Sequence, residues 1–71
     1  MNKDQIQGHW NEAKGKIKQT WGNLTDNDVT KLTGKRDEIE GLLQQKYGYE
    51  KEKAKKEVDN FIRVNGWDKD E

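Results

Sequence analysis

The stretch GKIKQTWG, residues 15–22, is echoed by GLLQQKYG, residues 41–48, in the same frame. A longer alignment of residues 8–22 with 34–48 pairs three glycines, two further identical residues, and an aromatic with an aromatic. Such a repeat indicates one helical unit that is used twice. It predicts an all-α fold built from two copies of a helix–turn–helix hairpin, with the first helix corresponding to the third and the second to the fourth.

The composition describes one small, very hydrophilic domain. The 71 residues are 28% hydrophobic and 39% charged, which allows a single thin core. A core of this size leaves at most about 3–5 kcal/mol of net stability. The chain has no cysteine and one histidine, so we expect no disulfide, no metal site and no cofactor.

The charges and the first residues bear on localisation and partners. The 14 basic and 14 acidic residues balance, so no long-range field draws the chain to nucleic acid or to a membrane. The start, MNKDQIQGHW, lacks the apolar run of a signal peptide. No stretch approaches the roughly 20 apolar residues of a membrane span. We therefore expect a cytoplasmic protein without a membrane span.

Apolar residues spaced by three and four predict a first helix over about residues 3–21, ended by Gly22 in a left-handed conformation. Its stripe is Ile6, Trp10, Ala13, Ile17, Trp21 and Leu24.

Thr25 and Asp28 have the spacing of a capping box, which predicts the start of a second helix. Leu24 and Val29 flank this cap as a hydrophobic staple would. The apolar pattern then allows either one helix of about 22 residues or two helices that are separated at residues 33–34. We favour the break, with Thr33 capping the third helix, because glycine sustains a helix poorly.

Gly48 is expected to end the third helix, and the fourth is expected over about residues 50–64, closed by Gly66. Trp67 is placed to pack back on the core, and residues 68–71 are expected to fray. The single domain, residues 1–71, thus divides into a hairpin over about 3–33, a second over about 34–66, and a tail over 67–71.

Glycines within the predicted helices lie nearly opposite the apolar stripes. Two interpretations remain open. Either a second helix or a partner packs closely on the backbone at Gly8, Gly15 and Gly41, or these glycines are tolerated on the surface.

No catalytic group emerges from the sequence. Serine and cysteine are absent, and His9 lies off the apolar stripe, where a surface position is expected. Most carboxylates face lysines at helical spacing, a pattern typical of solvated faces. The sequence therefore predicts that the protein is not an enzyme.

One segment could hold a phosphate. Gly34 precedes Lys35 and Arg36 at a helix start, where backbone N–H groups and two cations could bind it, with Lys14 and Lys18 as further contacts. Acidic residues follow at once, so a turn with solvated charges is the favoured interpretation. The aromatic residues could stack on bases, but most of them lie on the apolar stripes and are expected in the core. Tyr49 and Trp67 are the less constrained pair.

Short motifs along nearly the whole chain resemble the CsbD-like family of small bacterial stress-response proteins. These motifs are MNKD (1–4), KGKIK (14–18), WGNLTD (21–26), GKRD (34–37) and YGY (47–49). The resemblance implies four helices in two orthogonally packed α-hairpins with an approximate internal duplication, similar to SAM-domain folds. It also implies expression under general stress and no assigned molecular activity.

Three functions fit these observations. The leading one is a non-enzymatic stress protein that acts as a hydrophilin-like protectant, because the chain is rich in glycine and strongly hydrophilic. The alternatives are a weak nucleic-acid-binding module, whose binding would depend steeply on salt, and a protein-interaction adaptor, with self-association as its simplest case. The sequence names no partner.

Overall fold

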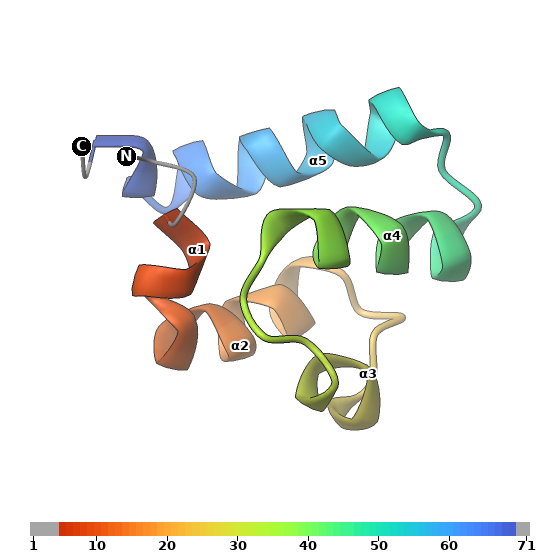
Figure 1. The fold of residues 1–71 in the computed structure, drawn as a ribbon, viewed down its shortest axis with the longest axis horizontal. Coiled ribbons are helices and arrows are strands. Elements are labelled where there is room, and N and C mark those ends of the chain that lie inside the picture. The colour runs from red at the N-terminus through yellow and green to blue at the C-terminus, as the bar shows by residue number, and fades with distance from the viewer. Residues whose placement is uncertain (1–4, 70–71) are drawn as a thin grey trace.

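The computed structural model describes residues 5–69, which form helices joined by short turns and contain no strand (Figure 1). The all-α prediction is thus confirmed for this part of the chain. The elements are α1 (Gln5–Gly8), α2 (Trp10–Thr20), α3 (Asp26–Thr30), α4 (Arg36–Tyr47), α5 (Lys51–Val64) and a 3₁₀ helix, η2 (Trp67–Lys69).

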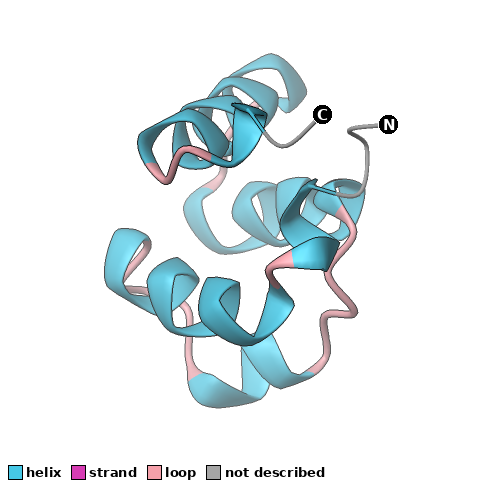
Figure 2. Cartoon of the chain, turned by 90° about the vertical axis from the view of Figure 1, so that its left-hand side faces the viewer, coloured by secondary structure: helices cyan, strands magenta, loops and turns pink. Residues whose placement is uncertain are grey.

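Helices α4 and α5 lie side by side and antiparallel, whereas α2 and α3 lie on the other side of α4 (Figures 1 and 2). Helix α1 contacts η2, so the two ends of the described chain meet. Helices α4 and α5 fall within residues 34–66, where the second hairpin is expected, but the division of the chain into two hairpins stays a prediction. Orthogonal packing of two hairpins and a SAM-like internal duplication stay predictions.

The predicted first helix is wrong in one respect, because the structure has two helices there, which are interrupted at His9. Its φ and ψ of −115° and 26° are not helical, and its N–H bonds to the Ile6 carbonyl, 3.0 Å away and only three residues back. Gly8 weakens the helix at this point, and the bend brings α1 against η2. Residues 3 and 4 of the prediction lie outside the described residues.

Gly22 does not end α2 in a left-handed conformation, contrary to prediction. Among residues 5–69, positive φ occurs at Gly34, Gly48 and Gly66. The helix ends at Thr20, and the next residue, Trp21, has φ −120° and ψ 89° and is only 3% exposed. Burial of this indole in the core therefore takes the chain out of the helix one residue early. The prediction for Gly48 is confirmed, since it ends α4 with φ 71°.

The capping box at the start of α3 is confirmed. The Thr25 hydroxyl accepts a bond from the Asp28 N–H at 3.2 Å, and the Asp28 carboxylate accepts one from the Thr25 N–H at 3.0 Å. Leu24 and Val29 are both buried beside it, as a staple requires. The predicted break between α3 and α4 is also confirmed.

The C-terminal end is more ordered than predicted. Trp67 packs back as expected, is 5% exposed, and meets Phe61 edge-on with 5.4 Å between ring centroids. Asp68 and Lys69, however, continue η2 rather than fraying. Burial of the Trp67 indole fixes this turn. Residues 70 and 71 lie outside the described residues.

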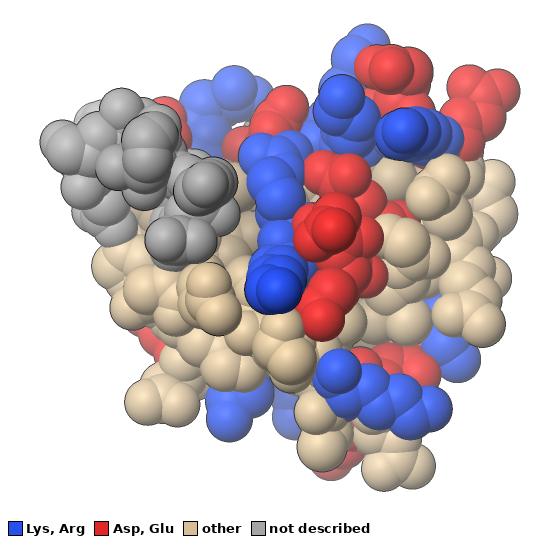
Figure 3. Space-filling view, in the orientation of Figure 1, with Lys and Arg blue, Asp and Glu red and all other residues tan. Residues whose placement is uncertain are grey.

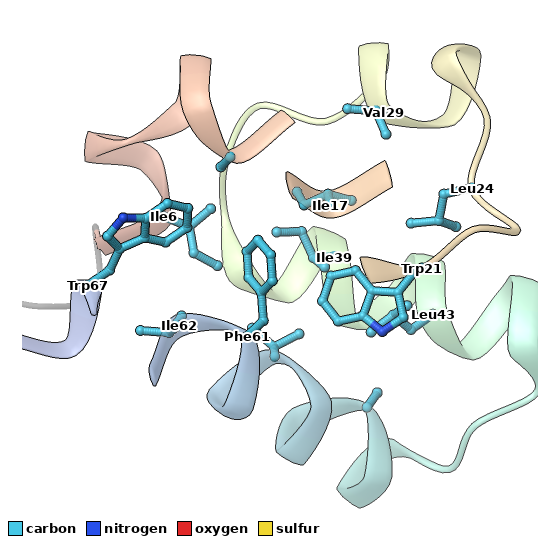
Figure 4. Close-up of a cluster of buried hydrophobic side chains, with 13 residues drawn as sticks. Ile6, Ile17, Trp21, Leu24, Val29, Ile39, Leu43, Phe61, Ile62 and Trp67 are labelled. Atoms are coloured by element: carbon cyan, nitrogen blue, oxygen red, sulfur yellow. The ribbon is translucent and has the colours of Figure 1, made fainter. Parts of the chain in front are cut away.

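The core is one cluster of thirteen buried side chains drawn from every helix (Figure 4). Its members are Ile6, Ala13, Ile17, Trp21, Leu24, Val29, Ile39, Leu43, Ala54, Val58, Phe61, Ile62 and Trp67. None of the helices within residues 5–69 has the length and apolar character needed to span a bilayer.

Candidate functional site

The candidate phosphate site, residues 34–36, lies in the turn before α4. Gly34 has φ +101°, and a Cβ built there would lie 3.2 Å from the Gln7 backbone Cα. Both facts require glycine at this position, because other residues rarely adopt such a φ and the space is filled by α1. The turn therefore packs on the N-terminal helix.

The backbone donors of this turn already hold an anion, the carboxylate of Glu38. It accepts bonds from the Thr33 N–H at 2.8 Å, the Thr33 hydroxyl at 2.9 Å and the Lys35 N–H at 3.4 Å. These bonds, above all that from the Thr33 N–H, lower the pKa of Glu38. The prediction that Thr33 caps α4 is wrong, because Lys35 occupies the cap position and the Thr33 hydroxyl donates to Glu38.

Arg36 forms a clamp between α4 and α5. Its Nε lies 3.0 Å from Glu40, and its Nη2 lies 2.6 Å from Asp59 and 3.3 Å from the Lys55 carbonyl. Burial acts against the charged guanidinium, but the bonds to Asp59 and Glu40 outweigh it and raise the pKa of Arg36. The guanidinium thus already binds two carboxylates of its own chain.

The structure places the other candidate cations in different settings. Lys18 bridges α2 and the start of α3 through an ion pair with Asp26. Lys14 and Lys35 are exposed, and no ion pair joins either to another described residue. Arg36 and Lys18 therefore serve different helix pairs, and their role as phosphate contacts stays a prediction.

The three candidate close-packing glycines face open space. A Cβ added at Gly8, Gly15 or Gly41 would meet no atom within 4 Å. The prediction that a second helix of this chain packs there is wrong, at least for residues 5–69. The close backbone approach occurs instead at Gly34. Approach of a partner to the three glycines stays a prediction.

A further ion pair, which the sequence did not predict, joins α3 to α4. Lys46 lies 3.4 Å from the Asp28 carboxylate, which is 8% exposed. The pKa of Asp28 is lowered, first by the bond from the Thr25 N–H and then by the Thr25 hydroxyl and Lys46, against the opposing effect of burial. The seventeen residues between the two side chains hide this contact from helical spacing rules.

The aromatic side chains have intramolecular roles. His9 is half-buried, not on the surface as predicted, and its ring stacks on Trp67 with 4.8 Å between centroids. The Tyr47 hydroxyl accepts a bond from the Asn23 N–H at 3.1 Å, and Lys53 lies over the Tyr49 ring. The first two contacts join parts of the chain that are far apart in sequence, and the third lies at the turn between α4 and α5.

The surface mixes both signs of charge. On the face shown in Figure 3, basic and acidic side chains alternate rather than gathering into a patch of one sign. Two open hollows, of about 350 and 230 Å³, lie at residues 7–12 and between α3 and α4. Residues 5–69 contain no group of three His, Cys, Asp or Glu side chains that could hold a metal ion.

These features define a small helical domain with a closed core and a charge-balanced surface. The model of the CsbD-like family matches residues 4–56, and the chain belongs to that family, as its motifs suggested. The UPF0337 protein YjbJ of Salmonella typhimurium is 53% identical over 67 residues, which cover 94% of this chain and 96% of the relative.

Two further relatives are equally similar. The UPF0337 protein ECA0631 of Pectobacterium atrosepticum is 56% identical and covers 86% of this chain and 88% of its own. The UPF0337 protein pc0632 of Protochlamydia amoebophila is 54% identical, over 86% of this chain and 92% of the relative. The names of these relatives state no activity, and the family is one of stress-response proteins.

Proposed function

We propose that this protein is a non-enzymatic cytoplasmic protectant, which acts in the manner of a hydrophilin as a folded particle. The observation that carries the proposal is the contrast between core and surface. Thirteen apolar side chains are buried together, and among the described residues Val64 is the one large hydrophobic side chain that is strongly exposed. With one such side chain, the described surface offers little apolar area through which copies could aggregate.

The mechanism follows from the charged surface. Charged side chains bind water strongly, and with 14 charges of each sign the molecule has no net field that would attach it to one class of macromolecule. Abundant copies would therefore separate other proteins and keep water around them during drying. This separation requires no specific binding site.

The proposal that the protein is not an enzyme is supported by the structural roles of the residues whose pKa is shifted. The pKa of Asp28 is lowered by the capping bonds from Thr25, and that of Glu38 by bonds from Thr33 in the turn before α4. The raised pKa of Arg36 arises from the α4–α5 clamp. Structural bonds of this kind account for the shifts without a catalytic role.

The test is the survival of an enzyme that loses activity on drying. It is dried with this protein, with an equal mass of a folded protein of low surface charge, and with a neutralised variant. The variant carries the substitutions Glu50→Gln, Lys51→Gln, Glu52→Gln and Lys56→Gln, which remove two charges of each sign from exposed positions around the start of α5.

The wild-type protein is expected to preserve most activity, the neutralised variant less, and the control protein least. Circular dichroism verifies that the variant keeps its helices. Equal protection by all three proteins would mean that the charged surface is not the cause, and the proposal would fail.

A further inference from the structure

Residues 65–66 form the one Asn-Gly sequence in the chain, which contains six asparagines. In this sequence the backbone nitrogen after the asparagine can attack the side-chain amide, because glycine has no Cβ to hinder the approach. Asn65 is the cap residue that follows α5, and Gly66 comes next with φ +76°. The turn that they form returns Trp67 to the core.

We propose that Asn65 is a spontaneous deamidation site that the fold protects, and that its conversion loosens the C-terminal turn. The Gly66 nitrogen loses its proton and forms a bond to the Asn65 Cγ, and the Cγ–Nδ2 bond breaks to release ammonia. Water then opens the cyclic imide at either carbonyl. The products are an aspartyl or an isoaspartyl residue at position 65.

The folded turn holds both reacting groups away from each other. The Asn65 side-chain amide donates to the Phe61 carbonyl at 2.8 Å, and the Gly66 N–H donates to the Arg63 carbonyl at 3.0 Å. Asn65 has ψ −1°, and the imide ring closes only after this angle rotates. Cyclisation therefore requires the last turn of α5 to open first.

The product would not restore the turn. A carboxylate at position 65 presents an acceptor to the Phe61 carbonyl, where the amide now donates, and places a negative charge at the negative end of the helix dipole. The isoaspartyl form also lengthens the backbone before Gly66. Trp67, which stacks on His9 and meets Phe61 edge-on, would lose the turn that positions it.

The test follows deamidation by peptide mapping with mass spectrometry at mildly alkaline pH. Wild-type protein is compared in buffer and unfolded in urea, and the unfolded Gly66→Ala variant provides the control for the glycine. In urea, Asn65 is expected to convert faster than the other asparagines, and the alanine variant much more slowly. In buffer, conversion of wild-type protein is expected to slow severalfold.

Two variants test the protection by the fold. Trp67→Ala removes the anchor and is expected to speed deamidation in buffer. If it unfolds the domain, His9→Ala, which removes the ring stacked on Trp67, takes its place. The Asn65→Asp protein is expected to melt at a lower temperature than wild type. Equal rates in buffer and urea, or conversion of Asn65 no faster than that of other asparagines in urea, would overturn the proposal.

Discussion

Replacement of Arg36 by glutamine tests whether this side chain is a clamp or a phosphate ligand. The structure gives it ion pairs with Glu40 and Asp59, with the three side chains 33%, 14% and 56% exposed. Partly exposed pairs contribute about 0.2–1 kcal/mol each. Loss of both, together with the bond to the Lys55 carbonyl, is expected to lower the free energy of unfolding by about 1–2 kcal/mol.

For a domain of this size, that loss lowers the melting temperature by about 5–15 °C, since about 1 kcal/mol corresponds to about 4–8 °C. The assay is thermal unfolding followed by circular dichroism, in low and high salt. The difference between wild type and Arg36→Gln should shrink in high salt, because salt screens the exposed part of the clamp. Lys14→Gln, which removes an exposed charge, is the matched control and should leave the melting temperature unchanged.

A double-mutant cycle with Asp59→Asn isolates the pair. The two substitutions together should cost less than their sum, because each removes the same contact. The reasoning would be refuted if the Arg36→Gln protein had the same melting temperature as the wild-type protein. It would also be refuted if the substitution abolished a salt-dependent binding of duplex DNA while leaving stability intact, since phosphate contacts predict that result.

Three further predictions follow from burial, backbone conformation and pKa. Leu43→Ala should cost about 2–5 kcal/mol, comparable with the whole stability expected for such a core, so urea unfolding should begin at the lowest denaturant concentrations. Gly41→Ala should raise the free energy of unfolding by about 0.5–1 kcal/mol, because the position is helical and open. Gly34→Ala should lower the free energy of unfolding by about 1–2 kcal/mol, because Gly34 has a positive φ. Folding lowers the pKa of Asp28 and Glu38 from ordinary values of 3.8 and 4.5, so their stabilisation is present above these values and is lost as the pH falls. Acid titration should therefore show stability declining below about pH 4.

Local signals predicted most of the fold. The capping box at Thr25, the end of α4 at Gly48 and the return of Trp67 to the core each depend on residues close together in the chain, and all three are confirmed. The break at His9 was missed because it depends on packing between α1 and η2, at opposite ends of the chain. A periodic apolar stripe does not report such a contact.

In the candidate site, too, contacts between neighbouring residues could be predicted from the sequence more readily than contacts between distant ones. The sequence located the turn at Gly34 and noted acidic residues after it, but it did not reveal that Glu38 folds back onto Thr33. Glu38 lies three residues after the cap residue, but lysine is not a usual capping residue, so the sequence carried no capping-box signal here. The contact between Arg36 and Asp59 joins residues far apart in the chain, so only the fold reveals it.

The most direct test of the account measures whether protection during drying requires the fold. Leu43→Gln places an amide in the fully buried core and keeps the formal net charge at zero, so it unfolds the chain with little change in composition. We expect the folded wild-type protein to preserve the dried enzyme and the unfolded variant to preserve it much less. Equal protection by the two would contradict the claim that the folded particle is the active form.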